Sequence, residues 1–174
     1  MEYNILNEHA NPKVETKRFK IYVDVGTNTT EWELQGRGVE NWTVEENVDV
    51  EKTTDVLGNV DIQRGTPHPT QSGVAVKLRK DSRLGQMLFE AFYTRDYTQL
   101  NSMKILQKFE FVDGVDADTC LARQEEDVMI VVNNFTGEAG GYLGFDIDIH
   151  YANKTTTGTM PKVDNNSITF TPDK

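Results

Sequence analysis

The sequence predicts a mostly β protein of the α+β class, a β-sandwich or barrel with a single amphipathic helix. Segments in which apolar and polar residues alternate recur along the chain, separated by turn-forming residues. One segment stands out because its apolar residues recur at helical spacing. The chain has 174 residues. Because a hydrophobic core usually stays single up to about 250 residues, we expect one domain over residues 1–174.

The first two alternating segments predict an antiparallel hairpin. Residues 19–25, FKIYVDV, alternate apolar with polar side chains, and residues 30–36, TEWELQG, set Trp32 and Leu34 opposite the acidic side chains. The turn-like sequence GTNT joins the two segments. We therefore expect the chain to reverse direction here and the two strands to pair.

The next segment predicts an acidic strand that leads into a long arm. Residues 42–51 place a tryptophan and valines on one side and mostly acids on the other, with Glu46 interrupting the apolar side. Residues 73–80, GVAVKLRK, can supply the partner strand. The intervening residues 52–73 contain several glycines and prolines and show no obvious tight hairpin turn. A connection of this length inside one domain is usually functional or disordered.

One amphipathic helix is predicted near residues 82–97. Asp81 or Ser82 can cap its first turn. The apolar stripe is expected to face the core and consists of Leu84, Met87, Leu88, Ala91 and Phe92.

Further alternating segments follow the helix and complete the predicted β structure. A turn is expected at Asp113 and Gly114, between the first two of them. The segments are residues 103–112, 116–124, 127–135, 142–152 and a short one at 167–171. Roughly eight strands and one helix favour the sandwich or barrel class.

The charge of the chain is negative and unevenly distributed. The formal net charge is −10, which argues against a general nucleic-acid-binding surface, since such surfaces cluster lysine and arginine. Acids dominate between Asp24 and Asp61. A solvated mixed surface and complementary contacts between identical subunits both fit this pattern. The basic residues gather in VKLRKDSR, as Lys77, Arg79, Lys80 and Arg83.

No segment carries a convincing catalytic, cofactor or metal motif. GRGVEN at 36–41 lacks the third glycine of a dinucleotide fingerprint, and DGVDAD at 113–118 lacks the spacing of a calcium loop. The three histidines share no metal-ligand spacing. Asp146 and Asp148 share one strand face and form a candidate acid pair, although a solvated or channel-facing surface is the simpler interpretation. We expect no enzyme activity, no cofactor and no metal.

The chain is also expected to have no membrane partner. No run approaches the roughly 18 apolar residues that a membrane span needs, and the first twenty residues do not follow a secretion-signal pattern. The single cysteine, Cys120, excludes an internal disulfide and favours a reducing compartment. Cys120 is expected to be a small buried hydrophobic residue.

Residues 30–59, TEWELQGRGVENWTVEENVDVEKTTDVLGN, resemble the opening of bacteriophage major tail proteins, the tail-tube subunits of long-tailed phages. The shared order is a hairpin, W-T with an acidic alternating strand, and a D-x-x-G-like arm. A basic strand, one amphipathic helix and a C-terminal run of strands follow in similar order, so that the resemblance covers most of residues 17–151. It depends on pattern and order more than on an invariant motif.

The resemblance implies a β-sandwich subunit that forms hexameric rings. Such rings stack into a hollow tube whose wall is a continuous β-barrel, and long loops reach the next ring. It also implies other tail proteins as partners (tape measure, tail terminator and baseplate), passage of DNA without adhesion, a place in the virion tail and assembly in the bacterial host cytoplasm. Related tubes serve contractile tails and type VI secretion, so a cargo other than DNA remains an alternative.

The residue patterns agree with this implication, because pairing between neighbours in a ring removes exposed sheet edges. Water-facing side chains of a barrel wall would point into the channel. The expected lumen-lining carboxylates are Glu31, Glu33, Glu45, Asp49, Asp146 and Asp148. The expected inter-ring arm carries Asp55, Val56, Leu57, Val60 and Ile62, and the basic patch Lys77, Arg79, Lys80 and Arg83 is expected between subunits. Residues 1–16 and 153–174 are expected to be N-terminal and C-terminal arms.

Two other classes of function compete with the tube. A monomeric carbohydrate-binding β-sandwich would use Trp32, Trp42 and Tyr142 as stacking platforms, but both tryptophans fall on apolar strand faces. A small hydrolase would use Asp146 and Asp148 as its acid pair. The absence of rings or tubes in electron micrographs would favour the carbohydrate-binding module.

Overall fold

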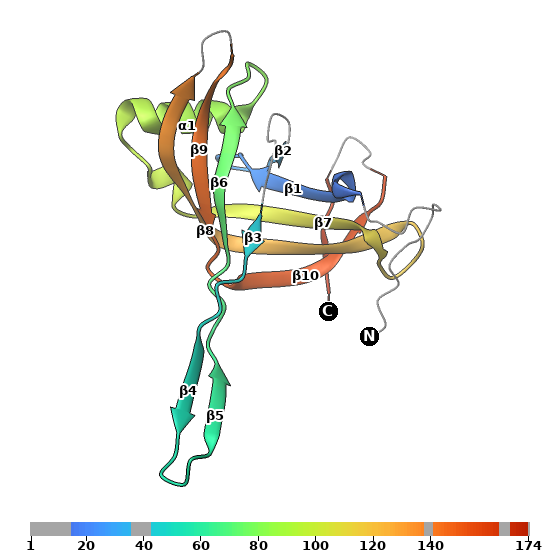
Figure 1. Cartoon of the computed structure of the whole chain (residues 1–174). Coiled ribbons are helices and arrows are strands. Elements are labelled where there is room, and N and C mark those ends of the chain that lie inside the picture. Colours follow the sequence, from blue (N-terminus) through green and yellow to red (C-terminus); the bar gives the residue numbers. More distant parts are fainter. Residues whose placement is uncertain (1–14, 36–42, 138–140, 164–167, 174) are drawn as a thin grey trace.

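The strands form one large antiparallel sheet and one separate hairpin. The computed structural model describes residues 15–35, 43–137, 141–163 and 168–173. Within these residues, nine strands share the large sheet, while β4 and β5 pair only with each other (Figure 1). The main path runs β2 (Trp32–Gln35), β1 (Phe19–Asp24), β7 (Met103–Asp113), β8 (Thr119–Gly137), β9 (Leu143–His150), β6 (Thr70–Lys77) and β3 (Val44–Glu45). The remaining strands are β10 (Lys154–Pro161), β11 (Thr171–Pro172), β4 (Val50–Thr54) and β5 (Val60–Arg64).

Strand β8 belongs to two parts of the sheet. Its first half pairs with β7 and β10, and its second half, from Met129, pairs with β9. At the change of partner Asp127 has a φ of 54°, and the pairing of β8 with β7 is irregular at the same level. A bulge of this kind bends a strand and increases its twist. The strands on either side of the bend run in different directions in Figure 1. We call them the β7 sheet (β2, β1, β7, the first half of β8, β10, β11) and the β9 sheet (the second half of β8, β9, β6, β3).

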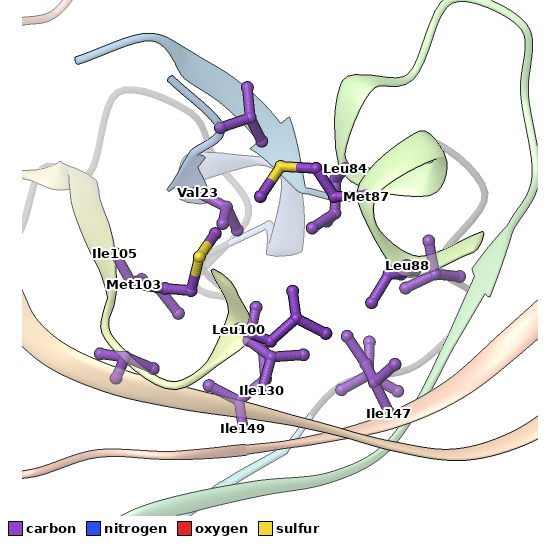
Figure 2. Packing of buried hydrophobic residues seen from close by; sticks show 14 of the residues in the cluster. Val23, Leu84, Met87, Leu88, Leu100, Met103, Ile105, Ile130, Ile147 and Ile149 are labelled. Carbon is purple, nitrogen blue, oxygen red and sulfur yellow. The ribbon is translucent and has the colours of Figure 1, made fainter. Parts of the chain in front are cut away.

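The main core lies between the two sheets and α1 (Arg83–Thr94). Figure 2 shows side chains from all three elements meeting there, with Leu100 from the short helix η2 (Thr98–Leu100). A smaller core on the other face of the β7 sheet contains Tyr22, Leu106, Cys120, Ala122 and Met160. The β7 sheet is therefore covered on both faces. Cys120 is completely buried, as predicted.

Helix α1 confirms the predicted amphipathic helix and one of its two candidate caps. The Ser82 hydroxyl accepts a hydrogen bond from the Gly85 N–H at 3.0 Å, which satisfies one of the unpaired donors of the first turn. Of the predicted stripe, Leu84, Met87, Leu88 and Ala91 are buried and Phe92 is partly buried. The helix ends where Arg95 adopts a left-handed conformation, with φ 61°. A second short helix, η1 (Thr16–Arg18), precedes β1.

The predicted β structure is confirmed in class and corrected in several boundaries. Strands β1 and β2 form the expected hairpin. The segments 116–124 and 127–135 are one continuous strand, β8, since the chain bends at Asp127 without turning back. Residues 154–161, assigned to a C-terminal arm, form β10, which pairs with β8 along its whole length.

The predicted acidic strand 42–51 is only partly correct. Its described part is interrupted after Glu45, and only Val44 and Glu45 pair with β6, opposite Gln71 and Thr70. Asn47 then adopts a left-handed conformation with φ 43°, which redirects the chain into β4. An asparagine tolerates this conformation better than most residues.

Candidate assembly surfaces

The uncovered face of the β9 sheet carries three of the predicted lumen carboxylates. Strand β9 alternates buried Phe145, Ile147 and Ile149 with half-buried Asp146 and Asp148. Because alternate residues point to opposite faces, the two aspartates lie on the face away from α1. Glu45 of β3 joins this face, since it pairs with Thr70, which in turn pairs with His150.

Asp148 is held in its ionised form on this face. Its Oδ1 accepts a hydrogen bond from the Gly73 N–H at 2.7 Å. Hydrogen bonds from the Asn133 side chain and from Gly73 lower the pKa of Asp148. A general acid near neutral pH needs a raised pKa, so Asp148 does not suit that role in an acid-pair hydrolase.

The other three predicted lumen carboxylates lie elsewhere. Glu31 is exposed at the edge of the β7 sheet, where its backbone N–H donates to Asp24 Oδ1 at 2.9 Å. Asp49 lies at the base of the arm, and its carbonyl accepts from the Gly65 N–H at 2.8 Å.

Glu33 takes a different role, at the N-terminus of α1. Ser82 Oγ donates to Glu33 Oε1 at 2.6 Å, and the Leu84 N–H donates to Oε2 at 2.9 Å. A carboxylate at this position satisfies the free N–H groups of the helix and complements its dipole. Glu33 pairs with Val23 and therefore lies on the same, core-facing side of the sheet. Glu33 has no water-facing side available, because both faces of this sheet are covered.

The predicted arm is a β-hairpin that projects away from both cores (Figure 1). The expectation of no tight turn is wrong. Asp55 closes the turn, with Oδ1 accepting from the Leu57 and Asn59 N–H groups at 2.8 Å each, and Gly58 has a φ of 83°. Hydrogen bonds from Asn59 chiefly lower the pKa of Asp55, so the turn carries a negative charge. The four apolar residues predicted for the arm, Val56, Leu57, Val60 and Ile62, are all exposed.

The root of the arm is tied to the sheet by backbone and amide hydrogen bonds. The His68 N–H donates to the Glu46 carbonyl at 3.1 Å, and Asn47 Nδ2 donates to Thr70 Oγ1 at 2.7 Å. The Tyr151 N–H donates to the Pro69 carbonyl at 3.1 Å. The root is therefore attached to β9 as well as to β6.

Beneath the root lies a buried polar network that the sequence analysis missed. Arg123 Nη2 donates to Gln107 Oε1 at 2.7 Å, and the Tyr151 hydroxyl donates to Gln71 Oε1 at 3.3 Å. Gln107 Nε2 lies 3.5 Å from the Tyr151 hydroxyl and connects the two pairs. Burial chiefly raises the pKa of Tyr151 to about 12, which keeps its hydroxyl protonated. The sequence signal for this network was a glutamine, Gln107, at an apolar position of an alternating strand.

Glu125 completes the network. Its Oε1 lies 2.9 Å from Arg123 Nε, and its Oε2 accepts from Thr155 Oγ1 at 2.7 Å. Burial is the main reason that the pKa of Glu125 is raised, and Glu46 of the arm root adds to the effect. A hollow of about 200 Å³ separates the network from the root residues Val44, Glu46, Pro67 and Pro69.

The predicted basic patch lies where β6 leads into α1, at the end of the β9 sheet away from the arm (Figure 1). Lys77 Nζ lies 5.9 Å from the centre of the Tyr142 ring. Arg79 pairs with Asp81 at 2.9 Å, and Lys80 is exposed. Arg83 opens the helix and donates to Gln86 Oε1 at 3.4 Å.

The two described aromatic residues considered for sugar binding, Trp32 and Tyr142, lie in different parts of the molecule. Trp32 packs against the smaller core, and Trp42 lies outside the described residues. In the part of the chain that the structure describes, no three His, Cys, Asp or Glu residues are grouped as metal ligands. No described helix combines the length and the apolar character required to span a bilayer.

Solved structures with the same fold come from contractile injection systems. No family model and no curated protein matches the chain. A chain of the sheath–tube complex of an extracellular contractile injection system, PVC, in the extended state is 9% identical, with a TM-score of 0.50 over 87% of this chain and 94% of that one. The PVC sheath/tube terminator in the extended state is 12% identical, with a TM-score of 0.52 over 86% and 99%. The tube-terminating cap of the anti-feeding prophage AFP is also 12% identical, with a TM-score of 0.52 over 88% and 95%. The mostly β fold with one helix is thus the fold of chains from these assemblies.

Proposed function

We propose that the chain is a structural subunit of a tail tube or of the related tube of a contractile injection system. Six copies would form a ring, and rings would stack into a hollow tube in contact with the other tail proteins of a virion or particle. The observation that carries the proposal is the arm, a hairpin with an exposed apolar tip that packs on neither described core. A monomeric binding module gains nothing from such a hairpin, whereas a stacked subunit can bury it in a neighbour.

The uncovered face of the β9 sheet is the surface that we assign to the lumen. Glu45, Asp146 and Asp148 lie on it together, and the opposite face packs against the core and α1. Duplex DNA carries one negative charge about every 1.7 Å. An acidic wall would repel DNA and let it pass without adhesion, and it would serve a protein cargo in the same way.

The free edges of the β9 sheet support assembly in a ring. Within the described residues, β3 pairs with β6 on one side only, and the second half of β8, from Met129, pairs with β9 on one side only. Unpaired edge strands readily pair with another chain. Pairing between such edges of adjacent copies would extend the β9 sheet around the ring and close it as a barrel.

Negative-stain electron microscopy of the purified protein, over a range of protein and salt concentrations, tests the proposal. Hollow tubes of stacked rings are the expected result. Single rings that never stack would instead favour a terminator, a role carried by two of the chains with this fold. A monomer at every concentration would contradict the assignment.

A further inference from the structure

The arm has two unlike faces and a tip of its own. The pairing of β4 with β5 places Val50, Val60 and Ile62 on one face, where Lys52 and Arg64 also lie, and Glu51 and Asp61 on the other. Val56 and Leu57 project from the turn at the tip. An isolated two-stranded hairpin is marginally stable in water. An apolar face and tip without a core beneath them therefore favour burial against another surface.

The opposite end of the β9 sheet offers a surface of matching chemistry. A hollow of about 510 Å³ lies there, lined by Lys77, Thr136, Tyr142 and Asp146 among others. Tyr142 is 75% exposed and Leu143 is 54% exposed. This end thus exposes an aromatic and an aliphatic side chain beside the hollow.

The hollow is lined by Lys77 and Asp146 and has the rest of the basic patch beside it in the chain, whereas the outer half of the arm is acidic. The basic patch begins at Lys77, which lines the hollow, and contains four basic residues against the single acid Asp81 within residues 77–83. Residues 53–61, which form the outer half of the arm, contain two aspartates and no basic residue. The two ends of one molecule therefore complement each other in charge as well as in apolar character.

Stacking identical rings in one direction brings these two ends together. Such a stack uses heterologous contacts, in which one surface of a subunit meets a different surface of the next. Strands of five residues span about 16 Å, so the hairpin extends well beyond the root to which it is tied. An arm at one end of the subunit must then meet elements at the other end of a second copy.

We propose that the arm of one copy docks in the hollow beside Tyr142 of a second copy in the adjacent ring. Val56 and Leu57 cover the exposed Tyr142 and Leu143 side chains, and Asp61 lies near the basic patch. This inference rests on the proposed function, because it takes the second copy from a stacked ring. It assigns the receptor surface, which the resemblance to tail proteins does not identify.

Disulfide trapping between two differently marked copies tests the docking. One copy carries Leu57→Cys, and a ¹⁵N-labelled copy carries Tyr142→Cys, both with Cys120→Ala. Mild oxidation of the mixture should yield a mixed dimer whose linked peptides are identified by mass spectrometry. The control copy carries Tyr93→Cys, on the outer face of α1, where the side chain is 78% exposed. Cross-linking to position 93 as efficient as to position 142, or none to position 142, overturns the docking.

A charge exchange provides a second measurement that does not depend on a disulfide. Asp61→Lys should reduce polymerisation several-fold, and Lys80→Glu in the same chain should restore much of it. Electron micrographs of the parent protein test the proposed function independently of the docking. Tubes without the cross-link contradict only the docking site, whereas the cross-link without tubes supports the docking and contradicts the stacked tube. If the two charge changes are simply additive, Asp61 and Lys80 are not partners and the assigned orientation is wrong.

Discussion

The two antiparallel strand pairs that flank the root of the arm, β6 with β9 and β4 with β5, have the same kind of backbone pairing but different support. β6 and β9 pair antiparallel and bury Val74, Ile147 and Phe145 against α1 and the β7 sheet. β4 and β5 pair antiparallel without the register shift that interrupts β6 and β9, yet every residue in both strands is exposed. The chain passes directly from β5 to β6, through the root. A regular β ladder therefore does not indicate that a segment contributes to the core. Under the proposed function, the arm becomes buried only when subunits assemble.

The largest effect should come from removing the arm. Asp49 and Gly65 are hydrogen-bonded at its base, so residues 50–64 can be replaced by Asn-Gly, a favoured two-residue hairpin turn. We expect a folded subunit with an almost unchanged melting temperature that forms no tubes. Circular dichroism and negative-stain microscopy measure the two properties. Long tubes from this variant would mean that the arm does not join rings.

Truncating one side chain in each strand pair sharpens the comparison. Ile147 is completely buried and Ile62 is 60% exposed. Ile147→Ala should lower the free energy of unfolding by about 2–5 kcal/mol, since it leaves a cavity. Ile62→Ala should change it by less than about 0.5 kcal/mol and yet weaken polymerisation. Urea denaturation of both variants gives the stabilities, and sedimentation gives the polymerisation; a large loss of stability in Ile62→Ala would show that the arm supports the monomer.

Helix α1 and the hairpin of β1 and β2 were predictable because their buried apolar residues recur in the sequence at the period of a helix and of a strand. Leu84, Met87, Leu88 and Ala91 recur at the spacing of one helical face, and all are buried. Strand β10 was not predictable in this way. Its sequence, KTTTGTMP, is rich in threonine, and Met160 is the only large apolar side chain that it buries.

The candidate surfaces were harder to predict because they depend on which faces are covered. The alternation of residues 31–35 predicts that the Glu33 side chain faces water. The β7 sheet has a core on each face, so no water-facing side exists at this position. The turn of the arm was missed because Asp55 closes it through side-chain hydrogen bonds, without the common Asn-Gly pair. The alternation of side chains along a strand is enough to place the two acids of β9 on one face. That Glu45 lies on the same face could be learned only from the pairing of β3 with β6 and of β6 with β9.

A smaller effect is expected from charge reversal on the two sides of the β9 sheet. Glu45 lies on the uncovered face, and Glu90 lies on the exposed side of α1. Glu45→Lys changes a ring of six by about twelve charge units on a narrow wall, where field lines are focused. Tubes of this variant should retain added oligonucleotides at low salt and release them as salt rises.

Glu90→Lys makes the same change of charge on the outer side and is the matched control. Its tubes should retain less oligonucleotide than those of Glu45→Lys. Filter retention and microscopy on both variants provide the comparison. Equal retention, with tubes of normal shape, would remove Glu45 from the lumen and would point to Glu31 or Asp49 as candidates.

The smallest effect concerns Glu125, the buried carboxylate beneath the arm root. Burial raises its pKa above the ordinary value of 4.5, so the folded chain binds this proton more tightly than the unfolded chain. The resulting stabilisation is fully present below about pH 4.5 and is lost as the pH rises through the raised pKa. Glu125→Gln cannot ionise and keeps a side chain able to bond Thr155. The stability of this variant relative to the parent should therefore increase with pH above 4.5 and then level off. Urea midpoints measured between pH 4 and pH 8, with the partly exposed Glu126→Gln as control, test this dependence, and a difference that stays constant with pH would show that burial does not govern this carboxylate.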